Sequence, residues 1–151
     1  MHAAGLSLPL DNVQAFRDEF EKVVAASILP DQLIPKIAVD QEVNFDFINF
    51  KTIDILRQMA PFGPQNLEPT FCSKNVFFKN PPRILKEAHL KMTLYQEGQQ
   101  AGFDAIGFGM ANWSEKISVN EPFQTLYHVE QNEYQGNKSL QLNLKDIKLA
   151  E

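Results

Sequence analysis

The chain has 151 residues, of which 44% are hydrophobic, 12 are Phe and one is Cys, a composition typical of a globular domain or a small domain plus part of another. No apolar run approaches the roughly 20 residues of a membrane span, and no signal-peptide pattern is present, so we expect a cytoplasmic protein. The lone Cys72 excludes an internal disulfide, and the net charge of -5 argues, by itself, against a nucleic-acid partner.

The charge is unevenly distributed along the chain. Residues 1–69 carry five Lys or Arg against ten Asp or Glu, whereas residues 70–151 carry nine of each. Between Lys74 and Lys91 there are five basic residues and one acid, Glu87. This local surplus is large enough for a modest phosphate-binding patch.

The first predicted element is an amphipathic helix from about Asn12 to Ala26. Asp11 is a suitable N-cap, and Gln14 stands three residues later, as in a capping box. One apolar stripe follows the helical period, and we expect it to pack on a core. Its members are Val13, Phe16, Phe20, Val23 and Val24.

A strand and a second helix follow. Apolar and polar residues alternate from Lys36 to Phe45, which predicts a half-buried strand. Asn49 is a suitable cap for a helix from Phe50 to about Met59, and Pro61 ends it. The stretch from Pro61 to Phe71 contains three prolines and separates this helical half from a half with the period of β-strands.

The second half predicts five strands and one short helix. The strands are Thr70–Phe78, His89–Gln96, Phe103–Gly109, Gln124–Glu130 and Ser139–Ile147, and the helix is Asn112–Ser118. Alternation predicts that Leu90, Met92 and Leu94 of the second strand point inward, as do Leu140, Leu142 and Leu144 of the fifth. This order is typical of an oligonucleotide-binding (OB) barrel, although five strands could also form an SH3-like barrel. The predicted fold is therefore α+β, a mainly β five-stranded OB-like barrel with an N-terminal helix-strand-helix segment.

Catalytic chemistry is not indicated for these residues. The histidines His2, His89 and His128 are far apart and form no metal-binding motif, and no glycine-rich phosphate loop is present. We expect His128 to be structural. The chain should therefore bind rather than catalyse, without a metal or cofactor of its own.

Single-stranded nucleic acid needs a basic groove and aromatic faces for its bases, and OB barrels place these on strands two and three and the adjoining loops. The residues of this chain that would converge there form our predicted nucleic-acid site, without catalytic residues. They are Lys74, Lys79, Arg83, Lys86, His89, Lys91, Tyr95, Tyr134 and Lys138.

Several segments also resemble one family. Ala3-Ala4-Gly5 is similar to the end of the Gly-Gly-His-x-x-Ala-Ala-Gly motif in the DHHA1 domain of RecJ-type single-stranded-DNA exonucleases, whose Gly-Gly-His would precede Met1. Pro61-Phe62-Gly63-Pro64-Gln65-Asn66-Leu67-Glu68-Pro69 resembles that family's Pro-Phe-Gly-x-Gly-Asn-x-Glu-Pro run, departing from it at Gln65. The segments 89–94 and 104–110 follow in the family's order, and so does 132–136, which leads to Gln141-Leu142 and Asp146-Ile147.

The resemblance implies the C-terminal region of a 5'-3' exonuclease of DNA repair and recombination. Residues 1–28 would end a DHHA1-like domain, 29–69 would connect it, and 70–151 would form the OB-like barrel that binds single-stranded DNA. The Mn²⁺ or Mg²⁺ of such an enzyme would be held in a DHH catalytic domain absent from this chain, so we expect the chain alone to be inactive.

Two alternatives stay open. The barrel could be a structural scaffold or a protein-interaction barrel within the same enzyme, in which case its outward basic and aromatic residues would be buried against residues 1–60. It could also bind RNA, which shares the need for a basic and aromatic surface.

Overall fold

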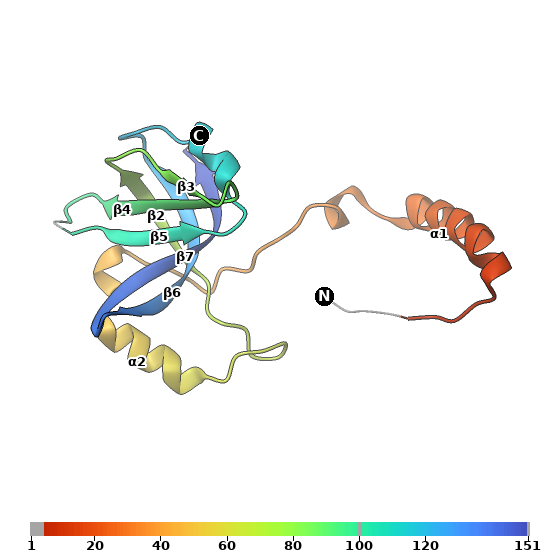
Figure 1. The fold of residues 1–151 in the computed structure, drawn as a ribbon, viewed down its shortest axis with the longest axis horizontal. Coiled ribbons are helices and arrows are strands. Elements are labelled where there is room, and N and C mark those ends of the chain that lie inside the picture. The colour runs from red at the N-terminus through yellow and green to blue at the C-terminus, as the bar shows by residue number, and fades with distance from the viewer. Residues whose placement is uncertain (1–4, 100, 151) are drawn as a thin grey trace. The chain divides into compact units, whose positions relative to one another are not determined.

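The computed structural model describes residues 5–99 and 101–150. The chain divides into two compact units, Met1–Ile37 and Ala38–Glu151, which are described separately (Figure 1). In the described parts of the chain, no helix is long and apolar enough to cross a membrane. His2, and Ala3 and Ala4 of the motif noted above, lie outside the described residues.

The first unit contains one long helix, α1 (Val13–Ser27), between two 3-10 turns, η1 (Leu10–Asn12) and η2 (Pro30–Gln32). The predicted capping box is wrong, because Asp11 lies inside η1 and Asn12 stands at the N-cap without a side-chain cap. The Gln14 side chain instead donates to Asp18 Oδ1 at 2.9 Å.

The apolar stripe of α1 differs from expectation. It forms on one side of the helix, where Phe16 and Phe20 stack with ring centroids 5.6 Å apart, but no residue of α1 is buried. Among residues 5–37, only the two short turns flank α1, and they form no second layer on which the stripe could pack.

The predicted strand at 36–45 is mostly wrong. Only β1 (Gln41–Glu42) is a strand, parallel to β2 (Phe71–Phe78). Just before it, the Asp40 carboxylate accepts from Thr70 N at 2.8 Å and so takes the place of a backbone acceptor. Just after it, the 3-10 turn η3 (Phe45–Phe47) buries Phe45. The alternation of apolar and polar residues in 36–45 therefore belongs to a segment that pairs with β2 over two residues and then turns into the core.

Helix α2 (Phe50–Met59) has the predicted bounds and cap. The Asn49 side chain accepts from Lys51 N at 2.9 Å and from Thr52 N at 3.2 Å. Ile53 and Leu56 are buried, whereas the two ends of the predicted stripe are about half exposed. The face that packs is therefore confined to the middle of the helix.

Five strands close into a ring, namely β2, β4 (His89–Gln96), β5 (Phe103–Gly107), β7 (Asn137–Leu149) and β6 (Phe123–Tyr134). Strand β2 pairs antiparallel with both β4 and β6, and β5 pairs parallel with β7. This is the strand connectivity of an OB barrel. The predicted OB-like fold is therefore confirmed, and the SH3-like alternative is not confirmed.

The structure corrects several bounds. The predicted loop 79–88 contains an edge strand, β3 (Arg83–Leu85), paired antiparallel with β4. The predicted helix at 112–118 is the 3-10 helix η4 (Ala111–Glu115). Strand β5 ends at Gly107, since the chain turns at Gly109, whose φ is +72°. Strands β6 and β7 are longer than predicted and meet at a two-residue turn.

The barrel core follows the predicted alternation. Leu90, Met92 and Leu94 of β4 point inward and are at most 5% exposed. Leu142 and Leu144 of β7 are buried in the same core, and the partly buried Leu140 packs against it. The residues between these positions therefore point outward, which places every second residue of β4 and β5 on one continuous outer face.

Candidate nucleic-acid interface

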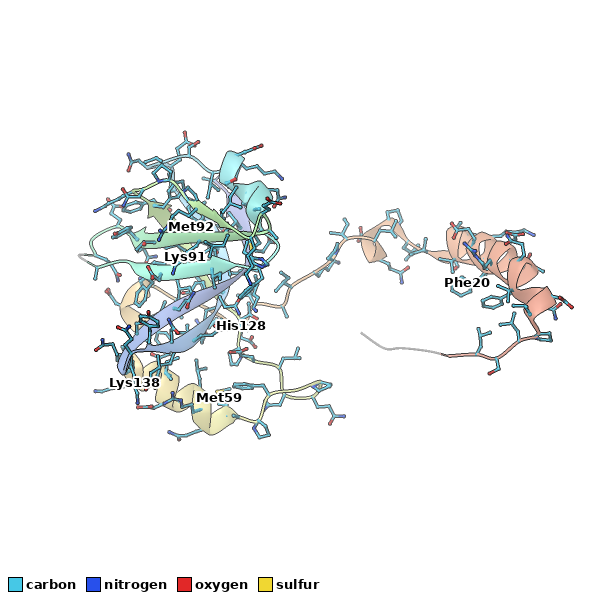
Figure 2. All side chains as sticks on the ribbon, in the orientation of Figure 1. Phe20, Met59, Lys91, Met92, His128 and Lys138 are labelled. Carbon is cyan, nitrogen blue, oxygen red and sulfur yellow. The ribbon has the colours of Figure 1, made fainter. Side chains whose placement is uncertain are left out.

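The outer face of β3, β4 and β5 is built from two rows of side chains across the strands. In one row Arg83 lies opposite Lys91, and Lys91 lies opposite Ile106; in the next, Thr93 lies opposite Asp104. Figure 2 shows Lys91 beside Met92, the inward residue that follows it. Residues from separate strands thus meet because register, not sequence distance, sets their neighbours.

A hollow of about 240 Å³ lies on this face and includes residues of both rows. Five polar side chains contribute to its lining, Asn80, Arg83, Lys91, Thr93 and Asp104. Lys91 Nζ is 3.9 Å from Asp104 Oδ2, and Thr93 Oγ1 donates to Asp104 Oδ1 at 3.2 Å. The hollow therefore combines two cations with one carboxylate and neutral hydrogen-bonding groups.

An aromatic platform occupies one end of β4. Tyr95 stacks on Phe77 with ring centroids 6.1 Å apart and planes at 22°, and Lys79 Nζ lies 4.7 Å from the centre of the Tyr95 ring. The ring also packs tightly against Gly102, where an added Cβ would lie 2.7 Å from Tyr95 Cε1. Sequence reasoning missed Phe77, although its place between the buried Val76 and Phe78 indicates an outward side chain.

The other end of β4 carries a second aromatic group. His89 Nδ1 accepts from Gly109 N at 3.1 Å, and the edge of its ring meets Phe108 at a centroid distance of 5.2 Å. Phe108 is 58% exposed and was also missed. The signal available in the sequence was a large aromatic residue between Gly107 and Gly109. Lys86 is exposed nearby in the β3–β4 turn, where its φ is +49°.

Three other predicted site residues lie away from the hollow. Lys74 forms an ion pair with Glu42 at 2.6 Å, and its hydrogen bond to that carboxylate raises the pKa of Lys74. Tyr134 and Lys138 flank the β6–β7 turn, beyond the part of β7 that pairs with β5. Figure 2 shows Lys138 at that end of β7. The structure thus brings Lys79, Arg83, Lys91 and Tyr95 together on one face. It places His89 and Lys86 at the other end of β4, and Lys74, Tyr134 and Lys138 elsewhere.

His128 and Cys72 are occupied by the barrel itself. His128 Nδ1 is 2.7 Å from Glu68 Oε2, and its Nε2 is 3.1 Å from Thr70 Oγ1, contacts that suit the structural role expected for it. Burial, followed by the field of Glu42, raises the pKa of the Cys72 thiol. Among residues 5–99 and 101–150, no three His, Cys, Asp or Glu side chains are grouped so as to hold a metal ion.

The closed ring and its connectivity define a protein of the OB-fold class. Residues 39–146 match the model of the RecJ OB domain, and the chain belongs to that family. The predicted membership of the RecJ family is therefore confirmed.

Individual relatives agree with this assignment. The chain is 25% identical over 150 residues to the single-stranded-DNA-specific exonuclease RecJ of Bacillus subtilis, covering 99% of this chain and 19% of that protein. It is 31% identical over 147 residues to RecJ of Dickeya dadantii, covering 96% and 25%. The chain thus spans about a fifth to a quarter of the length of these relatives.

A solved structure shares the fold. The crystal structure of RecJ in complex with Mn²⁺ from Thermus thermophilus aligns with a TM-score of 0.70 and 16% identity, covering 97% of this chain and 20% of that one. At that identity the likeness concerns the fold alone.

Proposed function

We propose that this chain is the single-stranded-DNA-binding C-terminal region of a RecJ-like 5'-3' exonuclease, with DNA bound on the outer face of β3, β4 and β5. The observation that carries the proposal is the pairing of Arg83 with Lys91 on the same outer face of β4 as Tyr95, whose ring stacks on Phe77. The cations suit phosphates, and the rings suit unpaired bases, which a duplex would keep stacked.

In this proposal the barrel gives the enzyme affinity and a preference for single strands. Hydrolysis would occur in a DHH domain outside these 151 residues, where Mn²⁺ or Mg²⁺ would be bound, and residues 1–28 would end the DHHA1-like domain. The bacterial relatives named as single-stranded-DNA-specific exonucleases support this assignment. The proposal includes the cytoplasmic role in DNA repair and recombination that the family resemblance implies. We also propose that residues 29–69 connect the two domains and that residues 70–151 form the DNA-binding barrel.

The test is fluorescence anisotropy of a labelled oligo-dT of about 12 nucleotides, titrated with the 151-residue chain at several salt concentrations. We expect affinity to fall as salt rises from about 50 to about 200 mM, and duplex DNA to bind more weakly. Lys91→Glu and Tyr95→Ala should each weaken binding, whereas Lys51→Glu, the same charge change on α2, should have little effect. Absence of binding at low salt, or equal affinity for duplex, would contradict the proposal.

The scaffold alternative is favoured by two contacts between the barrel and the segment that precedes it. The ion pair of Lys74 with Glu42 joins the barrel to a segment that precedes it, and Gln99 hydrogen-bonds Asp46 in the same region. If the scaffold role is the principal one, Lys91→Glu should leave oligo-dT binding unchanged. Competition between DNA and RNA oligomers of the same sequence would test the RNA-binding alternative.

A further inference from the structure

Asp104 is an acid in the middle of a basic surface. Its side chain is 57% exposed, on the strand next to Lys91 and in the lining of the hollow. A carboxylate repels phosphate, so a surface that served only to follow the DNA backbone would gain nothing from it. Because its carboxylate lines the hollow, Asp104 is suited to a ligand group that donates hydrogen bonds.

The carboxylate has acceptor capacity to spare. An ionised Asp offers about four lone-pair positions on two oxygens. The Thr93 hydroxyl uses one of them on Oδ1, and Lys91 Nζ, at 3.9 Å from Oδ2, is beyond hydrogen-bond length. Oδ2 and part of Oδ1 are therefore able to accept from a ligand, while Thr93 fixes the orientation of the carboxylate.

We propose that this hollow is a base-selective subsite that takes a guanine from the bound single strand, a role that rests on the proposed DNA binding. Guanine presents two adjacent N–H donors, at N1 and N2, which can both bond to one carboxylate. Its O6 and N7 are acceptors, which suit the donors of Arg83, Lys91 or Asn80.

Thymine is the base that this arrangement suits least. Its Watson–Crick edge offers a single N–H donor between two carbonyl oxygens, so one carbonyl would face the Asp104 carboxylate. Cytosine and adenine offer an amino group without the second adjacent N–H, and so leave one carboxylate oxygen without a base donor. The chemistry of the hollow therefore ranks guanine first and thymine last, with the other two between them.

The experiment compares labelled oligo-dT of about 12 nucleotides with versions in which one central thymine is replaced by dG, dI, dC or dA. A single dG avoids structures formed by guanine runs, and dI is guanine without its N2 amino group. We expect dG to bind at least about fivefold more tightly than all-dT. We expect dI to lose most of that gain.

Variants of the same chain separate the subsite from general binding. Asp104→Asn keeps the Thr93 hydrogen bond but removes the paired acceptors, so it should abolish the dG preference while leaving all-dT affinity equal or slightly higher. Glu115→Gln removes one negative charge from η4 and should keep the preference. If all-dT binds and dG gives no gain, or if the gain survives in Asp104→Asn, the subsite is refuted and DNA binding stands. If no oligonucleotide binds at low salt, both proposals fail.

Discussion

Arg83 on β3 and Lys91 on β4 lie directly opposite each other across an antiparallel ladder, so two like charges share one face of the sheet. Opposed like charges in such pairs destabilise a sheet. The pairing is therefore a cost to folding that binding of a polyanion would offset.

This relationship predicts opposite effects on stability and binding. Arg83→Gln should raise the free energy of unfolding by roughly a few tenths of a kcal/mol, because the repulsion is removed. The same change should weaken oligo-dT binding and make its salt dependence shallower by about one unit of slope. Urea unfolding and anisotropy on one preparation measure both quantities. A variant that loses both stability and affinity would show that Arg83 has a folding role instead.

Lys74 should contribute less to DNA binding than Lys91. Glu42 lies 2.6 Å from its ammonium group and already balances its charge, whereas the contact of Lys91 with Asp104 is longer. We expect Lys74→Gln to change oligo-dT affinity less than Lys91→Gln, each measured at the same salt concentration. Equal losses for the two variants would extend the interface to β2.

The cap of α2 should be worth about 1 kcal/mol. Asn49→Ala removes the side-chain acceptor of Lys51 N and Thr52 N, which typically costs about 0.5–2 kcal/mol. Asn12→Ala is the matched control, because Asn12 holds the N-cap of α1 without a side-chain hydrogen bond. Chemical denaturation of both variants gives the comparison. A similar loss of stability in both variants would show that the side-chain cap of α2 is not the cause of the loss in Asn49→Ala.

Tyr127 should make the barrel sensitive to alkali. It is fully buried, and burial raises its pKa above the ordinary value of about 10. Ser73 Oγ donates to Val43 O at 2.6 Å, so the Tyr127 hydroxyl is the donor in its 2.7 Å bond to Ser73. Above about pH 10 the unfolded chain releases this proton and the folded chain keeps it, so this contribution to stability, complete at lower pH, is lost as pH rises.

Tyr127→Phe isolates that contribution. The variant should lose about 1 kcal/mol at neutral pH, the usual net value of a buried hydrogen bond. Between about pH 9 and about pH 11 its stability should fall less steeply than that of the parent chain, by up to about 1.4 kcal/mol per pH unit. Urea midpoints at the two pH values measure the difference, and identical slopes would contradict the assignment.

The sequence by itself determined the elements whose signals are local. Alternation in 89–96 predicted both the bounds of β4 and its inward face, and Asn49 before an apolar period predicted α2, because these signals depend on neighbours along the chain. The order of strands, with one short helix between the third and fourth, was enough to predict the OB-like barrel. The motifs that resemble RecJ-type sequences were enough to predict the family.

Only the tertiary structure decided the rest. The strand expected at 36–45 gave way to contacts of Asp40 with Thr70, a residue 30 positions away. The outer face depends on register across β3, β4 and β5, which placed Asp104 beside Lys91 and Thr93. The parallel pairing of β1 with β2 brought Glu42 to Lys74. Local periodicity says which side of a strand a residue faces, but the neighbours across the sheet are set by pairing between distant segments.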